Sequence, residues 1–136
     1  MTVSLLAAAL LAQTLPAPGA AQWEPLGTPQ GGMANAIDPA SVARTGDRVA
    51  IRMRSERTAP DPDGMTVAMI AFTIDCRART ATLDGVDLYR PDGNFGRSVP
   101  GDDPRQIGND PMQRALYERA CRAPAAAPAP APAPAQ

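Results

Sequence analysis

The sequence predicts an α+β fold in which an antiparallel sheet of about five or six strands carries one C-terminal helix, packed on one face and tethered by a disulfide. The run at 65–76, MTVAMIAFTIDC, is long, apolar and β-branched, as expected of a central strand. Residues 110–122 have the pattern of an amphipathic helix. The chain has two cysteines, and Cys76 and Cys121 stand at the ends of these two segments, so one disulfide would join the helix to the sheet.

Length and charge limit the class of protein. With 136 residues the chain has room for one domain, which we place at 22–122. Its 13 basic residues, all arginine, balance 14 acidic residues, and the formal charge of −1 argues against a partner such as nucleic acid. Residues 1–21 read as a secretory signal peptide whose apolar centre is too short for a stable membrane span. We therefore expect export to the periplasm, the cell surface or the medium.

The strands are expected in the following order. Residues 33–38 suit a short edge strand, and the alternation of apolar and charged residues over 48–56 predicts a strand with one buried and one solvated face. The loop 59–64, APDPDG, has two prolines and a glycine and predicts a hairpin into the central strand. Two more strands, at 77–83 and 86–90, are expected on either side of a tight turn at Asp84-Gly85.

Residues 94–109 are rich in turn formers and are expected to be a loop. The helix then begins after Asp110, an N-cap, with Pro111 at its first position and Gln113 placed for a capping box. Apolar residues at four-residue spacing bring the second cysteine to the sheet side. The almost pure Ala-Pro segment at 123–136 predicts a disordered or semi-rigid tail.

The two cysteines allow two interpretations. In an exported chain, cysteines in separate elements favour a disulfide between Cys76 and Cys121, formed in an oxidising compartment. The alternative is a pair of buried free thiols. If the disulfide forms, we expect it to contribute strongly to the stability of the fold, because it closes a long loop.

The sequence contains no recognisable catalytic constellation. Histidine is absent, which removes the commonest general base and any histidine-activated nucleophile. Turn chemistry explains the acidic residues of the loops, namely Asp61, Asp63, Asp102 and Asp103, better than a calcium site does. We therefore expect no catalytic residue, no metal site and no cofactor.

One surface stands out as a candidate for partner binding. Arg48, Arg52 and Arg54 form a row on one strand, and such a row suits an acidic or sulfated partner. The alternative, which we favour, is a solvated face, because Glu56 and nearby aspartates dilute the charge. The apolar residues at 65–69 predict either a core contact or a homodimer contact.

The order of landmarks resembles a known family. Trp23 follows the signal peptide, and then come AIDPASVARTGDRVAIRMR, IDCRART, LYRPDGN and the helix end LYERAC. This is similar to the bacterial surface-adhesin protein E family over 23–122. The resemblance implies a helix held on the concave side of an antiparallel sheet by a Cys76–Cys121 disulfide. Family members bind host matrix and plasma proteins, and some form dimers; this chain lacks a lipid-anchor cysteine and a lysine-rich binding segment, so no binding residue transfers to it.

These observations predict an exported, non-enzymatic envelope protein that acts as a binding or structural module, with a protein or another envelope component as its partner. One alternative is a surface adhesin that binds host matrix or plasma protein through the arginine row. The other is an envelope enzyme that uses carboxylates, which requires two acids converging in a pocket.

Overall fold

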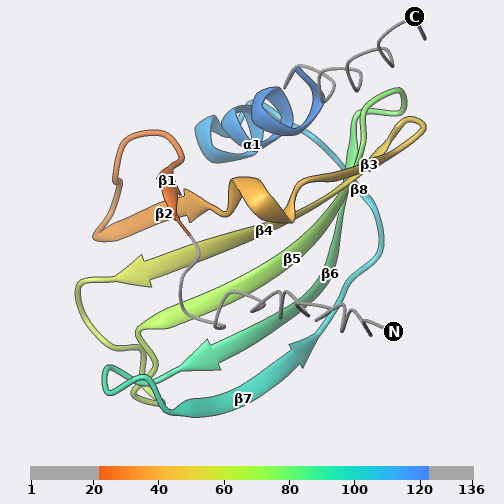
Figure 1. The fold of residues 1–136 in the computed structure, drawn as a ribbon. Helices are drawn as coiled ribbons and strands as arrows, with labels where there is room; N and C mark the ends of the chain where they lie inside the picture. The colour runs from red at the N-terminus through yellow and green to blue at the C-terminus, as the bar shows by residue number, and fades with distance from the viewer. Residues whose placement is uncertain (1–21, 123–136) are drawn as a thin grey trace, which may run out of the picture.

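The structure is a computed structural model that describes residues 22–122; the predicted signal peptide and the predicted tail lie outside this range. An antiparallel sheet and one long helix make up the domain (Figure 1). The elements are β1 Glu24–Pro25, β2 Met33–Ile37, a 3-10 turn at Pro39–Ser41, β3 Ala43–Thr45, β4 Arg48–Arg57, β5 Val67–Asp75, β6 Thr80–Tyr89, β7 Phe95–Pro100, β8 Arg105–Gln106 and α1 Pro111–Cys121.

The predicted fold class is confirmed, and the sheet has eight strands, more than the five or six expected. The main strands follow the order β1-β2-β4-β5-β6-β7, while β3 pairs with β4 and β8 pairs with β6. Of the strands that were not expected, β1, β3 and β8 are two or three residues long. Alternation cannot be recognised over so few residues, which is why the sequence did not reveal them.

The predicted tight turn at Asp84-Gly85 is wrong, because a single strand, β6, runs straight through this dipeptide. The register with β5 shifts at this point: Phe72 pairs with Leu83 and Ala71 with Gly85, so Asp84 is an extra residue, as in a β-bulge. The Thr73 hydroxyl donates a hydrogen bond of 2.8 Å to the Asp84 carboxylate across this irregularity. The chain reverses instead at 76–79, directly after β5.

The predicted loop at 94–109 is also partly wrong, because it contains β7 and β8. In β7, Phe95 is 54 % exposed and Val99 is 36 % exposed. β7 pairs only with β6 and lies at the end of the sheet. An edge strand exposed on this scale does not need the alternation that marks a half-buried strand, so its sequence resembles a loop.

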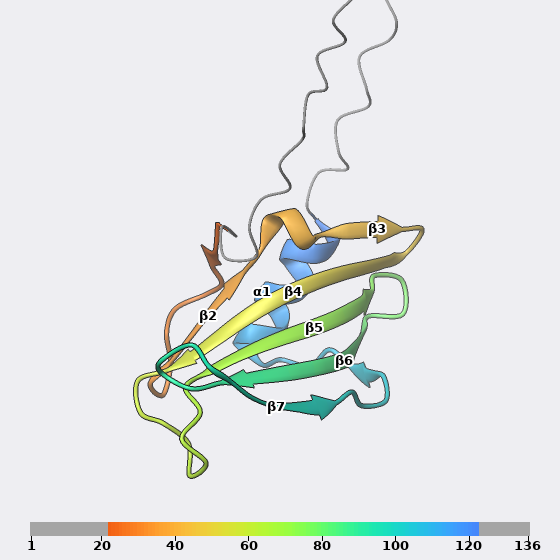
Figure 2. The same ribbon diagram turned by 60° about the horizontal axis from the view of Figure 1, so that its bottom comes forward.

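The alternation predicted for β4 produces the core. Val49, Ile51 and Met53 are buried, and Arg48, Ala50 and Arg52, which alternate with them, are exposed. The same face continues across the sheet, since Val49 pairs with Ile74 in β5. This face of the sheet carries α1, as the views in Figure 1 and Figure 2 show, and we call it the helix-side face.

The helix begins as predicted. Asp110 Oδ1 accepts a hydrogen bond from the Gln113 backbone N–H (3.0 Å), and Pro111 occupies the first turn. The Gln113 side chain does not complete a capping box; its Oε1 accepts from the backbone N–H of Gly108 (3.1 Å) and ties down the preceding segment. Leu116 and Ala120 are buried against the sheet. No helix within 22–122 is long and apolar enough to cross a membrane.

Candidate functional site

The C-terminal half of α1 is fixed to the sheet by three kinds of contact. A disulfide joins Cys76 to Cys121, as predicted. The Tyr117 hydroxyl donates to the carbonyl of Cys76 (3.1 Å), and the guanidinium of Arg79 lies 4.6 Å from the Tyr117 ring centroid. Arg44 donates to the last carbonyls of the helix, those of residues 120 and 121, where a cation also complements the helix dipole.

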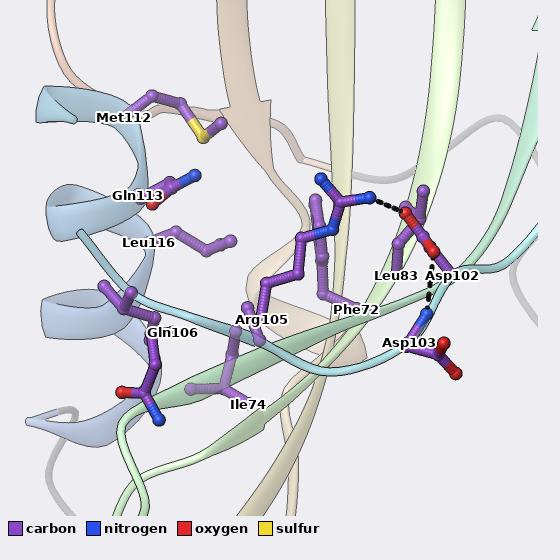
Figure 3. Close-up of a pocket in the computed structure, with 12 residues that line it drawn as sticks. Phe72, Ile74, Leu83, Asp102, Asp103, Arg105, Gln106, Met112, Gln113 and Leu116 are labelled. Carbon is purple, nitrogen blue, oxygen red and sulfur yellow. Dashed lines mark hydrogen bonds and ion pairs between the residues drawn. The ribbon is translucent and has the colours of Figure 1, made fainter.

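The helix covers only part of the helix-side face, because it packs mainly on β4 and β5. Beside the N-terminal half of α1 there is a hollow of about 260 Å³, which we call the first hollow (Figure 3). Its walls come from α1, β5, β6 and the segment 102–107, and are mainly apolar: Phe72, Ile74, Leu83, Ile107, Met112 and Leu116. A concave, mainly apolar site of this kind suits the apolar part of a ligand.

The rim of the first hollow is polar. Arg105 extends from β8 along the hollow and forms an ion pair with Asp102 (Figure 3). The backbone N–H of Asp103 donates to the Asp102 carboxylate (2.9 Å). The segment is therefore held by its own hydrogen bonds next to the apolar walls, and these groups can orient a bound molecule.

The two aspartates of this rim bear on the enzyme alternative. The Asp102 carboxylate turns toward Arg105, whereas the Asp103 carboxylate points away from Arg105 (Figure 3). Two carboxylates that act as a general acid and a general base flank a common point, and these two do not. Within residues 22–122 there is also no group of three or more acidic or cysteine side chains that could hold a metal ion.

The arginine row lies on the other face of the sheet, and two of its three charges are paired. Arg52 forms an ion pair of 2.8 Å with Asp38, whose side chain is 4 % exposed. Arg54 pairs with Glu56 (3.0 Å). Arg48 takes part in no ion pair among the described residues.

Asp38 fixes the position of the Arg52 side chain. The Asp38 carboxylate accepts from the backbone N–H of Ala40 (3.1 Å), and the Ser41 hydroxyl donates to the Asp38 carbonyl (2.6 Å) and accepts from the N–H of Arg52 (2.9 Å). These bonds join the 3-10 turn to β4. Arg52 thus neutralises a buried charge, which is a structural task.

The acidic loop residues behave as turn chemistry predicts. Asp61 Oδ1 accepts hydrogen bonds from the backbone N–H groups of Asp63 (2.9 Å) and Met65 (2.8 Å), and Gly64 adopts a φ of +82°. Asp63 pairs with Arg97 of β7 (3.0 Å). The loop after β4 is therefore fixed by its own side chains.

Sequence reasoning singled out some residues of the first hollow, such as Asp102 and Asp103, but did not predict that a hollow forms. Its rim is formed by β8 and the segment before it, which the sequence predicted to be a loop. Arg44, which donates to the helix end, was not singled out either. The spacing of Met112 and Leu116 marked them as the apolar side of the helix, but spacing alone does not show which strands the helix packs on.

A comparison with protein families gives one match. A model described as surface-adhesin protein E matches residues 23–122, essentially the whole described range. No curated protein and no solved structure matches the chain.

Proposed function

Since the chain belongs to the surface-adhesin protein E family, we propose that it is an exported, non-enzymatic binding module of the cell envelope. Its binding surface is the part of the helix-side face that α1 leaves uncovered, beginning at the first hollow. The periplasm or the cell surface suits a disulfide-bonded protein.

One observation carries this proposal: a helix that is covalently fixed at its end leaves an apolar hollow open on a rigid sheet. A hollow between packed elements keeps its shape without a ligand, so binding does not require ordering of its walls. Its apolar walls supply burial for a ligand, and its polar rim supplies orientation.

Site-specific photo-crosslinking in cells that export the protein tests the binding surface. A photoreactive amino acid at Leu83, in the wall of the first hollow, is expected to give adducts with an envelope component. The neighbouring residue Thr82 provides a matched control, since adjacent residues of a strand point to opposite faces. Adducts that are absent at Leu83, or equally abundant at Thr82, would contradict the proposal.

A second candidate function is that of an adhesin that binds its partner through the arginine row. One observation favours it: Arg48 belongs to this row and has no ion pair within 22–122. Binding to heparin or a matrix protein should then weaken with salt and be lost in the double variant Arg48→Glu and Arg54→Glu, which keeps the Arg52–Asp38 ion pair. Arg114→Glu, on the exposed side of α1, is the control. Binding that the double variant retains would exclude this face.

A further inference from the structure

The helix-side face carries a second hollow at its other end, beside the loop that joins β4 and β5. Its volume is about 280 Å³, and its apolar walls include Met33, Met65, Ile70 and Leu88. It lies on the same face as the first hollow, because Ile70 pairs with Met53, which belongs to the core under α1.

The two hollows are joined by a continuous apolar surface. Along β5, Ile74 and Phe72 line the first hollow and Ile70 and Ala68 line the second, and alternate residues of a strand share a face. Val86 of β6 pairs with Ile70 and lies between the two. We call this surface, with its two hollows, the trough; the six steps from Ala68 to Ile74, at ~3.3 Å each, give it a length of about 20 Å.

The second hollow also contains polar groups without partners. The Ser55 side-chain oxygen has no hydrogen-bond partner among the described residues, and Ser55 is 4 % exposed. Arg57, two residues further along the same face of β4, also lines this hollow, and its guanidinium takes part in no ion pair or hydrogen bond within 22–122. A buried hydroxyl without a partner is costly, and a ligand oxygen would satisfy it.

The charges at the two ends of the trough differ. The first hollow has two aspartates and one arginine on its rim. The second has Arg57 and Asp61, and one Asp61 oxygen already accepts two backbone N–H groups. An anionic group is therefore favoured at the Ser55 and Arg57 end and disfavoured at the Asp102 and Asp103 end.

We propose that the trough binds a fatty acid, with its carboxylate at Ser55 and Arg57 and its hydrocarbon chain lying along β5 and β6 toward α1. A hydrocarbon chain suits the apolar surface of the trough better than an extended peptide does, because a peptide would leave backbone N–H groups facing apolar side chains. The flexible side chains of Met33 and Met65 line the second hollow and can shift to admit a head group. The inference rests on the proposed function, for which it specifies the ligand.

Titration of the disulfide-bonded full chain with sodium laurate, followed by calorimetry and by NMR, tests this proposal. Laurate is expected to bind and to shift the amides of Ile70, Phe72 and Val86, and dodecanol, which lacks the carboxylate, to bind about tenfold more weakly. Laurate that shifts no residue of the trough, or dodecanol that binds equally well, would overturn the inference.

Four variants locate the carboxylate. Arg57→Gln is expected to weaken laurate binding about tenfold and Ser55→Ala about threefold. Arg48→Gln, on the opposite face of the same strand, is the matched control and should leave affinity unchanged. Asp61→Asn keeps an oxygen for the two backbone N–H groups but removes a negative charge, so it should strengthen binding.

The outcomes separate this inference from the proposed function. Equal laurate affinity in the Arg57→Gln and Arg48→Gln variants would overturn the head-group assignment, and so would weaker binding in Asp61→Asn. Crosslinks at Leu83 without laurate binding would retain the binding module and reject the fatty acid. Circular dichroism of each variant shows that the sheet is intact before affinities are compared.

Discussion

Removal of the Cys76–Cys121 disulfide is expected to lower the free energy of unfolding by about 4 kcal/mol. The two cysteines are 45 residues apart in the chain. On the chain-entropy model, closing a loop of this length restricts the unfolded chain by that amount. A domain is stable by only about 5–15 kcal/mol in total, so the loss takes a large share of it.

The folded state should nevertheless survive in part, because other contacts also hold the helix end. Arg44 donates to the carbonyls of residues 120 and 121, the Tyr117 hydroxyl donates to residue 76, and Leu116 is buried. We therefore expect a weakened helix contact rather than a released helix. The hollow beside α1 would then lose the rigidity on which binding depends.

Urea denaturation of the double variant Cys76→Ser and Cys121→Ser, compared with the wild type, measures the effect. Reductant should move the wild-type midpoint toward that of the variant and leave the variant unchanged, which is the internal control. A difference of less than about 1 kcal/mol would refute the loop-closure reasoning. If reductant shifted the midpoints of both proteins equally, the shift would not be caused by the disulfide.

Substitutions at three further positions test the packing and the polar contacts, all by urea denaturation. Leu116→Ala, at a site that is 2 % exposed, should cost about 2–5 kcal/mol, and a loss below that range would show that α1 is packed loosely. Asp38→Ala should cost about 2–3 kcal/mol, since it removes a buried carboxylate that holds Arg52 and a backbone N–H, while Asp38→Asn should cost less; equal losses would contradict the role of the charge. Ser55→Ala should raise stability by about 1 kcal/mol because it removes a buried hydroxyl without a partner, and a destabilised variant would mean that the hydroxyl is satisfied.

Some elements were predictable because their causes are local. The alternation in β4 identified both its buried and its exposed residues, and Asp110 and Pro111 located the start of α1. Capping acts within one helical turn and alternation within one strand, so both can be recognised in a single sequence. The positions of Cys76 and Cys121 at the ends of two such elements then predicted their bond, which the structure contains.

The errors came from features that depend on distant neighbours. Asp84-Gly85 suits a tight turn and a bulge equally well, and pairing with β5 selects the bulge. β7 is a strand because β6 pairs with it, although its own residues are exposed and irregular. Local propensity cannot distinguish such cases, because the deciding hydrogen bonds come from elsewhere in the chain.

The sequence by itself determined the strands β4 and β5, the helix and its cap, and the two residues of the disulfide, since each depends on the order of side chains along one short segment. Only the tertiary structure decided which arginines are free to bind a partner, for Arg52 is held by a carboxylate 14 residues away and Arg44 by the end of the helix. It also decided how far α1 extends over the sheet. That depends on where Cys76 and Cys121 anchor a helix of fixed length, and the first hollow lies between this helix, β5 and β6.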